Sequence, residues 1–125
     1  MEIVSALFVE GIEFRQAAGP STRIDLTGVF FSFQPEEYPA RMEPHLVVLL
    51  RCPPGGDPDA SLDVVFLREG EQVGSNRQVF AVEPGRFGYR LVKAELVFDE
   101  PGTIEARCTV PESGSSVTVP LTAIA

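Results

Sequence analysis

Apolar and polar residues alternate with a period of two along most of this chain. The clearest example is segment 103–110, where polar residues separate four apolar ones, namely Ile104, Ala106, Cys108 and Val110. This alternation puts one set of side chains on a buried face and the other in water, which is typical of a β-strand. Similar segments rich in Val, Phe, Ile and Leu predict strands at 2–10, 23–33, 45–52, 62–69, 78–82, 87–92, 95–99 and 117–124.

Turn residues and one change of parity divide these strands. Pro84-Gly85 and Pro101-Gly102 each place a fixed φ before a glycine that can take a positive one, so each marks a chain reversal. Within 87–98 the apolar positions shift from odd to even numbers, which predicts a bulge or a break near Lys93.

The first half of segment 87–98 also has the aromatic and basic character of an RNA-binding strand. It lacks the residue order of that motif, and no helix is predicted to complete the fold. We therefore expect an ordinary strand that buries Phe87, Tyr89 and Leu91 and leaves Arg86 and Arg90 in water.

Strands of this length, spaced about ten residues apart and joined by tight turns, predict an all-β fold. The expected architecture is a single antiparallel β-sandwich of about eight or nine strands, without substantial helix, and a small barrel is the alternative. The 125 residues suffice for one domain, residues 1–125, which can bury about two-thirds of its surface.

Segment 96–108, of sequence LVFDEPGTIEARC, resembles the strand, corner and strand of immunoglobulin-like and fibronectin-like domains. It has Ile104 where those domains carry a tyrosine, so no tyrosine corner can form. The order of an apolar N-terminal strand, segment 24–30, the Tyr38-Pro39 loop and the strand at 45–51 is similar to a bacterial family of small immunoglobulin-like β-sandwich proteins of unknown function. The resemblance implies a single cytoplasmic domain with an antiparallel immunoglobulin-like β-sandwich fold, and no assigned activity.

The net charge of the chain limits which partners we expect, and its cysteines are considered together with the expected cellular compartment. The chain has 18 acidic and 10 basic side chains, a net charge of -8, so nucleic acid and anionic membranes are not expected partners. Neither a membrane-spanning apolar run nor a basic leader is evident, which predicts a cytoplasmic protein. In that compartment Cys52 and Cys108 are expected to be buried free thiols.

Residues that support catalysis are scarce. His45 is the single histidine, and we interpret it as a residue at the entry of a strand. Zinc would need ligands at short spacing that this sequence does not offer, and no cofactor is expected. The alternative to a binding protein is a small enzyme or ligand-binding protein with a cleft around His45 and carboxylates.

One segment has the spacing of a calcium loop. Asp57, Asp59, Ser61 and Asp63 stand at every second position, as the oxygen ligands of such loops do. The sixth position, however, is Leu62 instead of glycine, and the twelfth is Arg68 instead of glutamate. We expect polar loop and strand residues here, with a calcium site as the weaker interpretation.

Consecutive phenylalanines in segment 29–33 must face both sides of a sheet, so one face needs a second cover. The cover is either segment 34–44 folding back or another subunit. In the second case Phe31, Phe33 and Tyr38 form the interface. The sequence thus favours a non-catalytic protein-interaction or assembly module that uses this patch or an exposed sheet edge, and a homodimer is one form that it can take.

Overall fold

A computed structural model describes the chain at residues 1–19 and 21–125, and these residues form eleven strands and no helix. The prediction of an all-β fold is confirmed. The strands are β1 (Glu2–Gln16), β2 (Thr22–Val29), β3 (Ser32–Phe33), β4 (Ala40–Met42), β5 (His45–Arg51), β6 (Asp59–Arg68), β7 (Glu71–Ala81), β8 (Phe87–Lys93), β9 (Leu96–Phe98), β10 (Gly102–Val110) and β11 (Ser115–Ala123).

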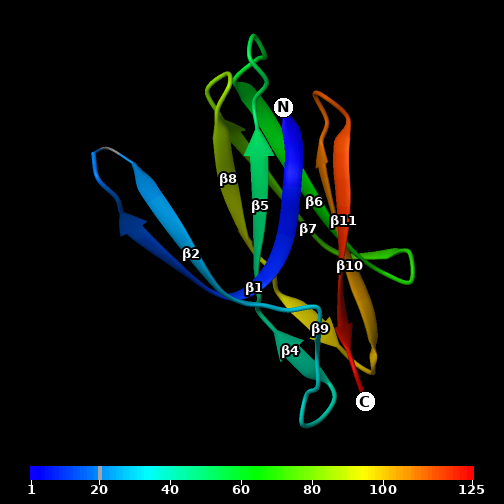
Figure 1. Ribbon diagram of the computed structural model, residues 1–125. Coiled ribbons are helices and arrows are strands. Elements are labelled where there is room, and N and C mark those ends of the chain that lie inside the picture. The colour runs from blue at the N-terminus through cyan, green and yellow to red at the C-terminus, as the bar shows by residue number, and fades with distance from the viewer. Residues whose placement is uncertain (20) are drawn as a thin grey trace.

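Two sheets contain nine of these strands. The first sheet has the order β2-β1-β5-β8 and the second the order β3-β11-β10-β6-β7, while β4 and β9 form a separate pair. Every pairing is antiparallel except that of β3 with β11. The N-terminus lies at one end of the molecule, and the C-terminus lies at the other end, close to β4 and β9 (Figure 1).

The two sheets enclose one apolar core. Phe8 of β1, Leu46 and Leu50 of β5 lie on the inner face of the first sheet, and they meet Leu62 of β6 and Ile104 of β10 from the second. The alternation predicted for segment 103–110 is confirmed, because all four of its even-numbered residues are buried in this core. Period-two patterning therefore identifies the inner face of β10 directly.

Cys52 and Cys108 are both buried and both free, as predicted. Desolvation by burial raises the pKa of the Cys108 thiol to about 11. The Sγ of Cys52 lies 3.5 Å from the carbonyl oxygen of Asp57, in the loop that follows β5.

The structure divides the chain more finely than the pattern predicts. Predicted strand 23–33 is interrupted after Val29, which yields β2 and β3, and the three-residue β4 is an additional strand. β7 begins at Glu71 instead of residue 78. Its first residues are polar and exposed, because an edge strand is held by backbone pairing and needs no apolar face there.

The expected burial of Phe87, Tyr89 and Leu91 is wrong. These side chains lie on the outer face of the first sheet, with Phe87 59% and Tyr89 39% exposed. The chain does break between β8 and β9, but the even residues Val92 and Phe98 stay buried on both sides of the break. Gly88 occupies the inner face, where an added Cβ would lie 2.7 Å from Val82 Cγ2, so no large side chain fits there.

The far half of β1 and its partner β2 form an arm, which we define as residues 10–16 and 22–28. The arm swings away from the body of the molecule, to the left in Figure 1. It begins where Glu10 lies against Gly28, whose φ is +67°. Because most side chains are strained at such a φ, a glycine here lets β2 bend with β1.

Candidate functional site

The three residues predicted to form an interface do not lie together on one open surface. Phe31 is 73% exposed, whereas Phe33 and Tyr38 pack against the core. The Phe33 ring meets Phe98 edge-on at 5.2 Å, and the Tyr38 hydroxyl donates to the carbonyl oxygen of Ile124 at 2.8 Å. Phe98 of β9 thus covers Phe33, and of the three residues Phe31 alone projects into solvent.

His45 begins β5 on the outer face of the first sheet, where its register partners are Val9 and Lys93. It is half-buried, and it lines none of the four surface cavities described below. Lys93 Nζ lies 3.7 Å from a carboxylate oxygen of Glu43, so the charges near His45 are already matched. His45 is therefore not part of any of these four cavities.

The residues with calcium-loop spacing do not converge on one point. Asp59, Ser61 and Asp63 belong to β6, where residues two positions apart are more than about 6 Å from each other. Calcium holds its oxygen ligands at about 2.4 Å, so three such side chains cannot share one ion. Across residues 1–19 and 21–125, no group of three or more His, Cys, Asp or Glu side chains is arranged to hold a metal.

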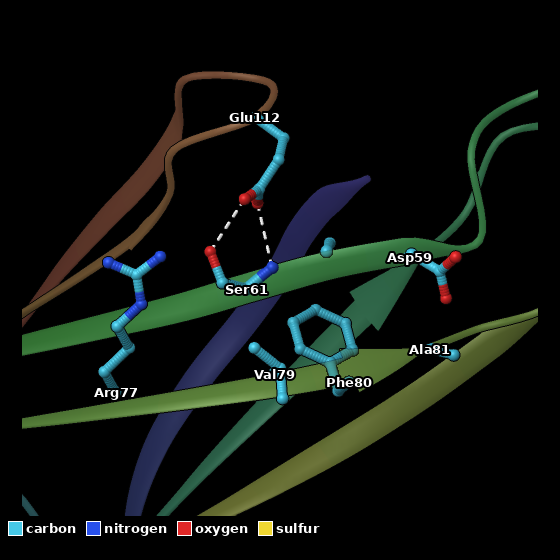
Figure 2. A pocket seen from close by; sticks show the side chains of 8 residues that line it. Asp59, Ser61, Arg77, Val79, Phe80, Ala81 and Glu112 are labelled. Carbon is cyan, nitrogen blue, oxygen red and sulfur yellow. Dashed lines mark hydrogen bonds between the residues drawn. The ribbon is translucent and has the colours of Figure 1, made fainter.

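The largest of the four cavities, of about 620 Å³, lies on the outer face of the second sheet beside β6 and β7 (Figure 2). Glu112, from the turn between β10 and β11, reaches over it toward Ser61. One carboxylate oxygen accepts from the Ser61 backbone N–H at 2.8 Å, and the other accepts from Ser61 Oγ at 2.7 Å. Arg77 and the exposed Val79 of β7 form the opposite wall.

The contact between Ser61 and Glu112 completes the backbone pairing of β6. β10 pairs with β6 as far as Thr109 and Asp63, so the N–H of Ser61 extends past the paired region. A buried N–H without an acceptor is destabilising, and Ser61 is buried. Hydrogen bonds from the Ser61 backbone and then from its hydroxyl lower the pKa of Glu112 below its ordinary value.

A carboxylate with a lowered pKa is a weak base, so this pair is poorly suited to activate a serine nucleophile. No histidine lines the cavity to take that role. We call Ser61 and Glu112 the Glu112 clasp, because their hydrogen bonds connect the turn between β10 and β11 to β6. The cavity beside the clasp is shallow, and its lining has more acidic than basic residues.

The most apolar cavity lies between the arm and the outer face of the first sheet. It measures about 450 Å³, and we call it the arm groove; its lining residues are Arg23, Ile24, Leu26, Leu49, Phe87, Gly88 and Tyr89. Across its end the rings of Phe14 and Tyr89 stand 6.0 Å apart. Phe14 and Phe87 are each more than half exposed, so aromatic rings flank the groove without closing it.

Sequence reasoning missed the arm groove for a specific reason. The odd-numbered apolar residues of β8 were detected, but an alternating strand does not reveal which of its faces points inward. Ile24 and Leu26 were assigned to a strand of the sheet, and nothing local shows that this strand folds outward at Gly28. The signal available in the sequence is the pair of aromatic residues at 87 and 89, which share one face of a strand whose other face carries Gly88 and Arg90.

Comparison with known proteins adds no assignment: neither a protein-family model nor a curated protein matches this chain. Within the described residues, no helix is long and apolar enough to cross a membrane.

Proposed function

We propose that this chain is a non-catalytic assembly module with an immunoglobulin-like sandwich fold, and that it associates with a second copy of itself through the arm groove. The order β1-β5-β8 in one sheet and β11-β10-β6-β7 in the other corresponds to A-B-E and G-F-C-C′ of that fold. This order supports the fold proposal, with the arm as an addition to strand A.

The observation that carries the functional proposal is the cluster of exposed aromatic rings at the arm groove. Phe14, Phe87 and Tyr89 all lie at its rim, and Leu49 forms part of its floor. Contiguous apolar surface of this kind is uncommon on a monomer, and aromatic residues are enriched where proteins meet. The groove offers few polar groups to orient a small polar substrate.

The total exposed surface area of the chain also supports a surface that a second copy covers. The chain exposes 7315 Å², whereas a compact monomer of its mass is expected to expose about 6,600 Å². The excess, roughly 700 Å², is close to the roughly 800 Å² that each partner contributes to an ordinary protein interface. A projecting arm that becomes covered on association accounts for this excess.

Shape and charge favour a second copy as that partner. A two-fold interface requires one patch to hold both projecting and hollow parts, and here the Phe14 and Phe87 rings flank a hollow lined by Leu26. Arg23 is the one charged residue in the groove lining, so two facing grooves bring no carboxylates together. The negative charge of the chain is carried elsewhere.

The test is the solution mass of the chain over a concentration series, measured by light scattering. We expect a monomer–dimer equilibrium that Phe87→Ser weakens by more than about 100-fold, because a two-fold interface buries Phe87 of both copies and each contributes about 1.5 to 3 kcal/mol. Val97→Ser is the matched control, since Val97 is also exposed but lies on β9, away from the groove. A wild-type chain that stays monomeric at millimolar concentration, or equal weakening by both variants, would contradict the proposal.

A further inference from the structure

The second sheet ends in a long strand with one free edge. β7 has 11 residues and pairs with β6 on one side, and no other described strand pairs with it on the other. At the opposite edge of the same sheet, β3 has just two residues. In the first sheet the edge of β8 is partly occupied, because the Gln78 side chain donates to the carbonyl oxygen of Leu91 at 2.9 Å.

The register identifies which backbone groups of β7 face this edge. Ser61 directs its N–H toward Glu112, on the β10 side of β6. Its partner in β7, Val79, therefore points its own N–H and carbonyl away from β6, and Arg77, opposite Asp63, does the same. Backbone groups of successive strand residues point to opposite sides. Val82 lies an odd number of residues from Val79, and its N–H accordingly points toward β6, where it donates to the carbonyl oxygen of Pro58.

Three cavities lie along β7. The one beside Ser61 and Val79 is on the outer face, and a second, of about 350 Å³, adjoins Ser75 and Arg77. A third, of about 290 Å³, is lined by Val73 and Gly74 of β7 together with Phe66, Lys93 and Glu95. Successive side chains of an added strand point to opposite faces, so they would find cavities on both.

Residues 75–81 of β7 contain no proline and no lysine, and Arg77, which lies beside Asp63, is their one charged residue. The bulge in β7 lies nearer its start, where the register with β6 shifts between Phe66 and Leu67. Val79 on this edge strand is 78% exposed, which is unusual for an apolar side chain.

The charges beside Val79 select the kind of partner. Asp59 and Glu112 both line the outer cavity (Figure 2), and the Nε of Arg77 lies 3.6 Å from the Asp63 carboxylate. Acidic groups are thus in excess on this face, in a chain of net charge -8. A basic side chain on the outer face of an added strand would be attracted here, and an acidic one would be repelled.

We propose that the free edge of β7 binds an extended segment of a partner protein, in which basic and apolar residues alternate, as a sixth strand of the second sheet. The basic side chains lie over Asp59 and Glu112, and the apolar ones point toward Phe66 and Gly74. This binding goes beyond the proposed self-association and uses none of the arm groove residues. A dimer of this chain would then hold two such segments.

The test uses a fluorescently labelled eight-residue peptide of alternating Lys and Val, with binding followed by anisotropy at physiological salt. Val79→Pro removes the N–H that an added strand needs, and it breaks no bond to β6, because that N–H points away from β6. We expect Val79→Pro to weaken binding at least tenfold, and the matched Val79→Thr, which keeps the N–H, to bind as the wild type does. Phe87→Ser should bind the peptide normally, so failure of dimerisation and failure of peptide binding are distinguishable.

Unchanged affinity of a folded Val79→Pro chain, no binding of the peptide at millimolar concentration, or equal binding of a Glu-Val peptide would each overturn the proposal. Should Val79→Pro not fold, two versions of the peptide give the equivalent test, one N-methylated at its odd-numbered residues and the other at its even-numbered residues. The version that has lost the N–H groups facing β7 should no longer bind, and equal binding of both versions would overturn the proposal.

Discussion

At the scale of single residues, several polar side chains form hydrogen bonds to backbone groups that the sheets leave unpaired. Glu112 satisfies the N–H of Ser61 at a point that β10 does not reach, and the Tyr38 hydroxyl satisfies a carbonyl near the C-terminus. No buried side-chain polar atom within the described residues lacks a partner. Such residues are candidates for catalysis by type, but their hydrogen bonds assign them to structure.

The Glu112 clasp makes stability depend on acidity. Its pKa is lowered in the folded chain, so its contribution is present above the ordinary pKa of a glutamate and is lost as the pH falls through the lowered value. We expect Glu112→Gln to reduce the melting temperature at pH 7 and to flatten its decline in acid relative to the wild type. Glu36→Gln, in an exposed loop, is the control, and identical acid profiles for all three chains would refute the assignment.

Burial of Cys108 makes its thiol unreactive in the folded chain. With a pKa of about 11, about one thiol in a thousand is ionised at pH 8, and the thiolate is the reacting form. We expect iodoacetamide to leave Cys108 unmodified in native protein and to modify it in urea, as located by peptide mass spectrometry. Because the pKa is raised, this thiol stabilises the fold below the unfolded pKa, and that contribution is lost as the pH rises toward 11. Rapid native labelling would show that the site is open.

At the scale of strands, the sequence predicts which segments form strands better than it predicts which face of each strand is buried. β10 has polar residues on one face only, so its inner face is unambiguous. The large apolar residues of β8 lie mostly on its outer face, whereas its inner face carries Gly88, Arg90 and Val92. This orientation depends on Gly88 meeting Val82 and on Phe14 of the arm meeting Tyr89, which are both contacts distant in sequence. β7 was predicted too short because its polar first half is held by pairing with β6.

Gly88 is the position where this orientation can be tested. A methyl group there would lie 2.7 Å from Val82 Cγ2, whereas one at Gly74 of β7 would make an ordinary 3.5 Å contact with Phe66. We expect Gly88→Ala to lower the free energy of unfolding by about 1 to 3 kcal/mol. Gly74→Ala should change it by less than about 1 kcal/mol, as measured by urea denaturation. Equal effects would mean that β8 does not present Gly88 to the core.

At the scale of the whole molecule, the proposed function rests on features that local patterns do not encode. The all-β class, the paired sheets and the free thiols follow from residues read in order. The arm groove combines β2, β5 and β8, and it exists because Gly28 lets the arm depart from the sheet. The candidate interface predicted at Phe31, Phe33 and Tyr38 is reduced to one exposed ring because the other two side chains pack against the core.

We propose that two copies of this acidic chain meet through an apolar groove. Sedimentation equilibrium of the unmodified chain, at about 50 mM and about 1 M sodium chloride, tests it most directly. Two chains of net charge -8 repel each other at low salt, and salt screens that repulsion while leaving apolar contact intact. The account predicts a dimer that becomes tighter at high salt; a chain that is monomeric in both buffers, or a dimer that dissociates at high salt, would contradict it.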